Sequence, residues 1–182
     1  MARRNKSTEF LKECIADALL KLMDEKPITQ ITALEITNAA GVGRATFFRH
    51  FSSKEEVLTF KLLLLWNRWA EEHSLIDISK FSLYTTKELF AFNLSIKPFI
   101  KKLYDEHLQN CIYDAFSKIM APQFGTDMVQ CYANRFYTYG CLALVDEWIK
   151  RGFLETPEQM AEIIIHEIVG KNVTLTEKEE QA

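Results

Sequence analysis

The stretch Ala40–Glu56, which reads AGVGRATFFRHFSSKEE, decides the fold of this chain. It places a glycine turn ahead of a short basic segment and closes on an S-x-x-E capping box, the pattern with which a helix begins. No acidic residue lies between Glu35 and Glu55, although the chain as a whole is mildly acidic, with 22 Lys+Arg against 25 Asp+Glu. A segment that keeps its cations and excludes carboxylates is suited to a polyanionic partner.

Two short helices are predicted on either side of the glycine turn. Thr32 is placed to cap a helix over residues 33–40, and Gly41 follows at the position where many helices end in a left-handed residue. A second short helix is predicted over residues 44–50. Because the residues between the two helices are small or face inward, we expect the helices to cross closely, as in a helix-turn-helix.

The rest of the chain is predicted to be helical as well. A helix capped by Ser7 or Thr8 precedes this pair and is stopped by Pro27, and another begins at Ser53 and continues to about His73. Residues 74–84 have weak periodicity and are predicted as a loop. The ranges expected as helices beyond it are 86–94, 97–104, 109–120, 127–151 and 157–169, the last capped by Thr156. With no repeats and no alternating strand pattern, the fold class is all-α, with about nine helices.

Composition limits the classes of protein to consider. A chain of 182 residues with 48% apolar residues can bury a sizeable core, and only 6 Gly and 4 Pro interrupt it. The four cysteines lie far apart without a C-x-x-C pair, so we expect buried free thiols. The densest apolar run, residues 62–66, is flanked by Lys61 and Arg68, and no segment approaches the ~20 apolar residues that span a bilayer. We therefore expect a cytoplasmic protein with no signal peptide and no membrane partner.

The second helix of the predicted pair presents a polar, basic face. Gly43, Arg44, Thr46 and Arg49 lie opposite the helix contact, on a rod that fits a major groove about 12 Å wide. The Arg44 guanidinium can donate two hydrogen bonds to O6 and N7 of guanine, and Thr46 offers a hydroxyl and a methyl to base edges. The residues therefore indicate double-stranded DNA as the partner.

Phosphate contacts are expected around this face. His50 and Lys54 follow the reading helix, and the amide groups of the helix capped by Thr32 can also hold a phosphate. Arg3 and Arg4 add a basic arm ahead of the first helix. Contacts of this kind supply affinity and orientation without reading the base sequence.

Residues 9–58 resemble the DNA-binding domain of the TetR family of bacterial transcription regulators. The resemblance is carried by Ile31-Thr32, Ile36, Ala39–Val42, Thr46–Phe48, His50-Phe51 and Lys54-Glu55, with their spacing intact. It implies that the third helix reads DNA and that Phe48, His50 and Lys54 anchor to phosphates. Phe48 stands where the family often has Tyr, which removes a phenol hydrogen bond, and Thr37 stands where Ala is usual.

The C-terminal part resembles the same family more loosely. Residues 140–152 and 156–165 are similar to the paired final helices through which these regulators dimerise. The residues expected at the dimer interface are Gly140, Ala143, Ala161, Ile164, Ile165 and Ile168. A homodimer would hold two reading helices about one DNA turn, ~34 Å, apart, which implies a near-palindromic operator.

Aromatic residues are abundant in the middle of the chain, and two interpretations of them stay open. They fill a core, or some of them line a small-molecule cavity of the kind that members of the family enclose. The candidate lining residues are Trp66, Phe90, Phe116 and Phe136. The resemblance thus implies two domains, residues 1–52 for binding DNA and residues 53–182 for dimerisation and for binding a small apolar effector.

Other chemistries find little support in the sequence. Gly41-x-Gly43 is not a phosphate loop, since no strand precedes it and no G-K-[ST] follows. The four histidines lack metal-ligand spacing, and adjacent side chains in Asp105–His107 point in different directions on a helix, so no metal site, cofactor or enzyme activity is expected.

The predicted function is a ligand-responsive homodimeric repressor. Two alternatives remain: a regulator without an effector that activates through protein contacts, and a helical enzyme or scaffold with an incidental helix-turn-helix.

Overall fold

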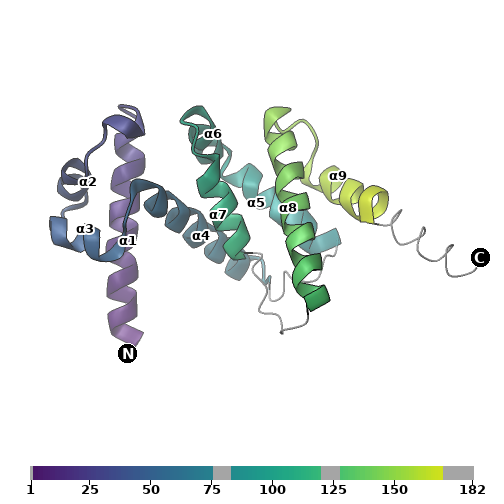
Figure 1. The fold of residues 1–182 in the computed structure, drawn as a ribbon, viewed down its shortest axis with the longest axis horizontal. Coiled ribbons are helices and arrows are strands. Elements are labelled where there is room, and N and C mark those ends of the chain that lie inside the picture. The colour runs from purple at the N-terminus through teal and green to yellow at the C-terminus, as the bar shows by residue number, and fades with distance from the viewer. Residues whose placement is uncertain (1, 76–82, 120–127, 170–182) are drawn as a thin grey trace, which may run out of the picture. The chain divides into compact units, whose positions relative to one another are not determined.

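The computed structural model describes residues 2–75, 83–119 and 128–169 of the chain. Every regular element in these ranges is helical, which confirms the predicted all-α class (Figure 1). The α-helices are α1 (Ala2–Leu22), α2 (Ala33–Ala40), α3 (Arg44–His50), α4 (Lys54–Glu72), α5 (Leu83–Ser95), α6 (Lys97–Asp105), α7 (Gln109–Ile119), α8 (Met128–Lys150) and α9 (Pro157–Glu162). A 3₁₀ turn, η1 (Ile28–Gln30), precedes α2, and a π-helical segment, η2 (Ile163–Val169), follows α9.

The helices form two compact units. Unit 1 consists of the described residues of 1–65 and 102–115, and unit 2 of those of 66–101 and 116–182. The unit boundaries therefore fall inside α4, α6 and α7, and the division into functional domains at residue 52 stays a prediction. Among the described residues, no helix combines the length and the apolar character that crossing a bilayer requires.

In unit 1, α1 supports the helix-turn-helix. α2 packs against α1 and α3 packs against α2. Ile15 and Leu19 of α1 and Ile36 of α2 are fully buried. Phe47 and Phe51 are each 2% exposed, and their ring centroids lie 6.0 Å apart. Burying side chains of this size contributes roughly 1.5–3 kcal/mol each, so the orientation of α3 is set by apolar packing.

Local hydrogen bonds fix the ends of these helices as the sequence predicts. The Glu35 amide donates to Thr32 Oγ1 at 3.3 Å, and the Thr32 amide donates to the Glu35 carboxylate at 2.9 Å, which completes a capping box. Gly41 ends α2 with a φ of +65°, a conformation that glycine adopts without steric cost. At the start of α4, the Glu56 amide donates to Ser53 Oγ at 3.2 Å.

The first helix begins earlier than predicted. α1 starts at Ala2, so Ser7 and Thr8 lie inside the helix, and Arg3 and Arg4 belong to its first turn instead of to an arm ahead of it. Nothing in residues 2–8 interrupts a helix, and Ala, Arg and Lys are good helix formers, whereas Ser and Thr in the interior cost little. The side chains of Arg3 and Arg4 lie outside the described part of the structure.

Two further expectations need correction. Leu83 and Tyr84 open α5 and do not belong to a loop, while the middle of the predicted loop, residues 76–82, lies outside the described residues. Of the four cysteines expected to be buried, Cys131 is exposed and Cys14 half-buried. Burial raises the pKa of Cys111 to about 11 and that of Cys141 to about 12, so both of these thiols stay protonated.

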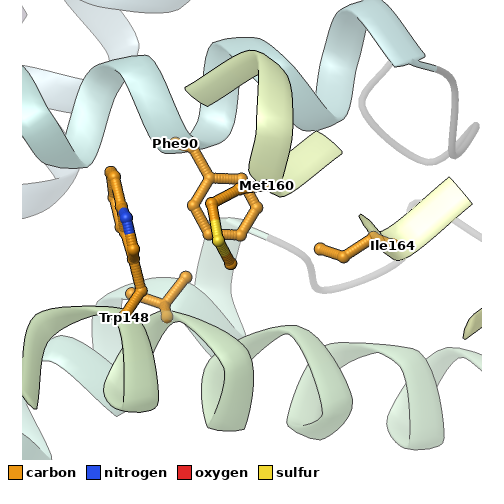
Figure 2. Close-up of a cluster of buried hydrophobic side chains, with 5 residues drawn as sticks. Phe90, Trp148, Met160 and Ile164 are labelled. Atoms are coloured by element: carbon orange, nitrogen blue, oxygen red, sulfur yellow. The ribbon is translucent and has the colours of Figure 1, made fainter. Parts of the chain in front are cut away.

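In unit 2, α5 and α9 pack together around a cluster of buried side chains. Figure 2 shows Phe90, Trp148, Met160 and Ile164 turned toward one another, with the Phe90 and Trp148 rings 5.1 Å apart and nearly perpendicular. Trp148 Nε1 donates to the Glu155 carbonyl at 2.9 Å, which satisfies its polar atom within the core.

The last predicted helix changes its type along its length. Thr156 caps α9 in a box with Gln159, and Pro157 takes the first position, as the sequence predicts. The α-helical part ends at Glu162, and the following seven residues form the π-helical segment η2.

Candidate nucleic-acid interface

Helix α3 turns its cations outward. Its one buried side chain is Phe47, which is 2% exposed, whereas Arg44, Phe48 and Arg49 are exposed and Thr46 is half-buried. Within the described part of the chain no carboxylate pairs with Arg44 or Arg49. The two guanidinium groups are therefore available to an anionic partner.

Arg44 contacts an aromatic ring one turn along the helix. Its guanidinium carbon lies 5.5 Å from the centroid of Phe48, and the Phe48 ring meets Phe47 edge to face at 5.2 Å. A cation over a ring face is stabilised by the ring quadrupole. Phe48 is 54% exposed, so the contact lies on the open side of the helix.

His50 ends α3 in a half-buried position with cations around it. Burial first, and then the charges of Arg49 and Lys12, hold the pKa of His50 below its ordinary value of 6.5. Lys12 reaches this region from α1, with its Nζ 4.1 Å from the centroid of Phe60. Lys12 is not among the site residues predicted from the sequence, because it lies far from His50 in the chain and nothing in the sequence signals their proximity.

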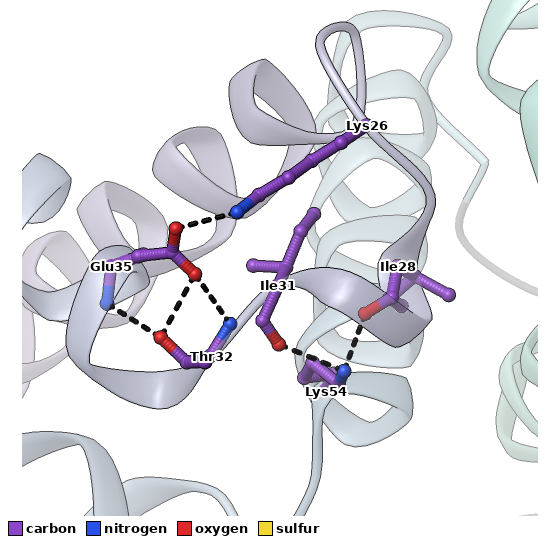
Figure 3. Close-up of polar contacts among 6 residues, drawn as sticks. All are labelled: Lys26, Ile28, Ile31, Thr32, Glu35 and Lys54. Carbon is purple, nitrogen blue, oxygen red and sulfur yellow. Dashed lines mark hydrogen bonds and ion pairs between the residues drawn. The ribbon is translucent and has the colours of Figure 1, made fainter.

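The start of α2 holds an anionic group of its own. Glu35 accepts from the amide and the hydroxyl of Thr32, both at 2.9 Å, and its other oxygen lies 2.5 Å from Lys26 Nζ (Figure 3). The Lys26 contact and then the Thr32 hydrogen bonds lower the pKa of Glu35 from 4.5 to about 2. A phosphate at Thr32 would therefore approach a charged carboxylate, although Lys26 balances it.

Lys54 is oriented differently from the other predicted DNA contacts. Its Nζ donates to the carbonyl of Ile28 at 2.5 Å and to that of Ile31 at 2.9 Å (Figure 3). The amide of Ile28 in turn donates to Glu106 Oε2 at 3.2 Å. Lys54 and Glu106 thus both bind the turn η1. This cluster was not predicted from the sequence, because its members are far apart in the chain.

The four candidate effector-lining residues do not share one environment. Trp66, Phe90 and Phe116 are buried in unit 2, whereas Phe136 on α8 is 72% exposed. Trp66 packs edge to face on Phe92 at 5.1 Å. The buried contacts agree with the core interpretation, and an effector cavity stays a prediction.

A polar group lies beside these aromatic rings. Glu88 of α5 is 7% exposed and accepts from Trp69 Nε1 at 3.2 Å. The Trp69 ring stacks on His73 at 3.9 Å. This cluster was not predicted from the sequence, since a single acidic residue in a helix usually lies on the surface.

The residues predicted for a dimer interface also differ in their exposure to solvent. Gly140 and Ala143 are exposed on α8, and Ile165 is half-buried. Ala161 and Ile164 are buried inside their own chain, where they are 0% and 2% exposed. The side chain of Ile168 lies outside the described part of the structure.

Larger apolar side chains are exposed along α8. Val129, Tyr132, Phe136 and Tyr139 recur every three or four residues and are 69%, 72%, 72% and 55% exposed. This spacing places them on one face of the helix. Of these four residues the sequence singled out Phe136, as a candidate for an effector cavity, and not this face of the helix.

Two family models match the chain. The model described as "Bacterial regulatory proteins, tetR family" matches residues 15–59, which contain α2, α3 and the start of α4. The model described as "Transcriptional regulator C-terminal region" matches residues 83–170, from α5 onward. No curated protein matches the chain.

Proposed function

Because this chain belongs to the TetR family of transcription regulators, we propose that it represses transcription as a homodimer on a near-palindromic operator. The observation that carries this proposal is the outward face of α3, where Arg44 and Arg49 are exposed with no carboxylate partner in the described part of the chain. A rod with this charge suits the major groove of DNA.

The residues of α3 have distinct proposed roles. Arg44 reads a guanine, and Thr46 and Arg49 contact neighbouring base edges. Gly43 lets the backbone at the start of α3 approach the DNA, since its missing side chain leaves the helix end open. The phosphate contacts are assigned to His50, Phe48 through ring packing, and the α2 start at Thr32.

The proposed dimer interface is the exposed apolar face of α8. Contiguous apolar patches of this kind are rare on monomers and mark interaction sites. Tyr132, Phe136 and Tyr139 would be covered by a second copy, and the exposed Gly140 and Ala143 would allow two helices to approach closely. A twofold dimer would present two copies of α3 to one duplex.

The proposed ligand response places a small apolar effector among the buried aromatic residues of unit 2. Trp66 and Phe116, which are buried, are the proposed lining residues, and Glu88 offers a polar group to orient a ligand. A ligand that binds the non-DNA-binding conformation more tightly would release the operator.

Selection of bound duplexes from a random pool tests the DNA-binding part of the proposal. We expect enrichment of a near-palindrome whose half-site centres lie about one helical turn apart. A scaffold or enzyme with an incidental helix-turn-helix would enrich no sequence. A transcription assay on the selected site then separates repression from activation.

A thermal-shift screen over varied apolar compounds tests the ligand response. We expect at least one compound to raise the melting temperature and to weaken operator binding in the same concentration range. Compounds that stabilise the protein and leave operator affinity unchanged would refute the switch and would leave the DNA-binding proposal intact.

A further inference from the structure

The ammonium group of the half-buried Lys54 binds backbone carbonyl groups of its own chain. Lys54 is the first residue of α4, and its Nζ contacts the carbonyl oxygens of Ile28 and Ile31 at 2.5 and 2.9 Å (Figure 3). Both isoleucines are buried, at 4% and 2% exposed. Two of the three donors of the ammonium group therefore serve a backbone segment inside unit 1.

That backbone segment sets the start of the helix-turn-helix. The Ile31 amide closes η1 on the Ile28 carbonyl at 3.1 Å, so this carbonyl accepts both a backbone and a Lys54 hydrogen bond. Ile31 is followed directly by Thr32, the N-cap of α2. Holding the Ile28 carbonyl of η1 and the carbonyl of Ile31, the residue after η1, thus fixes where α2 begins. α3 in turn packs on α2.

Other side chains hold the same segment from different directions. Glu106, between α6 and α7, accepts from the Ile28 amide at 3.2 Å. Lys26 bridges to Glu35, which caps α2 together with Thr32. Among the described residues, Lys54 is the one charged member of this network that lies on α4. Its hydrogen bonds therefore connect the start of α2 to the helix that follows α3.

We propose that Lys54 is a positioning residue that fixes η1, and through it the helix-turn-helix, on the start of α4. Family resemblance implies a phosphate contact at this position, and the geometry assigns a different task. If Lys54 turned to a phosphate, the carbonyls of two buried residues would lose this donor. The inference rests on the proposed DNA-binding function for its effect on affinity, and not for its effect on the free protein.

The salt dependence of operator affinity distinguishes the two roles. Each phosphate contact contributes about 0.9 to the slope of log affinity against log salt, so a contact made by both protomers contributes about 1.8. The variants are Lys54→Met, which removes charge and donors, and Lys54→Gln, which removes charge and keeps a donor. Lys21→Met, which removes an exposed cation at the end of α1, is the matched control, and Arg49→Gln tests the sensitivity of the slope.

We expect Lys54→Met to weaken operator binding about tenfold at every salt concentration with an unchanged slope. Lys54→Gln should recover part of this loss, also with an unchanged slope. In the free protein, amide exchange at Ile31, Glu35 and Ile36 should become faster in Lys54→Met and stay unchanged in Lys21→Met.

Two results would overturn the inference. One is a slope shallower by about 1.8 in both Lys54 variants, which would show a phosphate contact. The other is unchanged affinity with unchanged amide exchange, which would show that the contact positions nothing. Since exchange is measured without DNA, the inference is tested even if the wild-type protein selects no duplex, the result that would refute the proposed function. If Lys54→Met does not fold, Lys54→Gln carries the comparison of slopes.

Discussion

Arg44 and Phe48 lie one turn apart on α3, and the guanidinium of one is 5.5 Å from the ring centroid of the other. A phenylalanine at this position has no hydroxyl to offer a phosphate, but its ring face can hold the arginine in place before DNA arrives. Pre-orienting a flexible side chain reduces the entropy that binding must spend on it. In the proposed DNA complex, Phe48 would thus add to recognition by supporting Arg44.

Substituting Arg44 by Ala should relax the base preference at one position of each half-site. The expected loss is ~1–3 kcal/mol at that base pair, because the bidentate contact to guanine disappears. Competition binding against operators with single base changes measures it. Equal losses on all duplexes would contradict a base-reading role for Arg44.

Operator binding should strengthen as the pH falls toward and below neutral. Burial and the nearby cations hold the pKa of His50 below 6.5 in the free protein, so its imidazole is neutral there at neutral pH. A phosphate beside it favours the protonated form, so binding takes up a proton and gains from lower pH. His50→Gln should remove this part of the pH dependence in anisotropy titrations, and an unchanged pH profile would contradict the phosphate contact.

At the scale of elements, α2 and α3 were predicted at their observed bounds because their signals are local. Thr32, Glu35 and Gly41 fix the ends of α2 by contacts within three residues or by backbone conformation. η1 was missed because its partners, Lys54 and Glu106, lie 26 and 78 residues from Ile28. The burial of Ile164 within the chain likewise depends on packing with Phe90 of α5 and Trp148 of α8, which periodicity alone does not reveal.

The capping network of α2 should weaken in acid. The pKa of Glu35 is about 2 in the folded protein against an ordinary 4.5, so its contribution to stability is present above about pH 4.5 and is lost as the pH falls toward 2. Glu35→Gln should therefore lower the melting temperature near neutral pH, and the difference from wild type should shrink across this window. A difference that does not depend on pH would contradict the charge-based account.

The turn between α2 and α3 should tolerate a side chain at one glycine and not at the other. Gly41 has a φ of +65°, and a Cβ there would meet no atom within 4 Å, so Gly41→Ala carries a conformational cost of ~1–2 kcal/mol. Gly43 has a φ of −73°, and its Cβ would touch only Thr46 Oγ1 at 4.0 Å. Urea unfolding should show the loss for Gly41→Ala and little change for Gly43→Ala, and equal losses would contradict this explanation.

For the whole molecule, the proposed mode of DNA binding requires a second copy of the chain. Hydration of the exposed aromatic residues of α8 is unfavourable in free energy, and a homodimer would remove this apolar surface from water. The proposed dimerisation would also explain how a helix of seven residues gains affinity for DNA, since two half-sites on one duplex would be bound together.

Replacing Phe136 by Asp should dissociate this dimer. The substitution places a charge in the proposed apolar interface, where burial without a partner is costly. Leu154→Asp is the matched control, because Leu154 is 73% exposed but lies off α8. Sedimentation equilibrium should show monomers for Phe136→Asp and dimers for wild type and control, and a dimeric Phe136→Asp would contradict the assigned face.

The most direct test of the central claim is to map where α3 meets DNA. Ala45 is exposed on α3, and an Ala45→Cys variant in a Cys131→Ser background can carry an iron–EDTA group that cleaves nearby DNA. We expect two symmetric cleavage clusters on the selected operator, centred about 10 base pairs apart. Cleavage that is absent, or spread evenly along the duplex, would contradict the central claim.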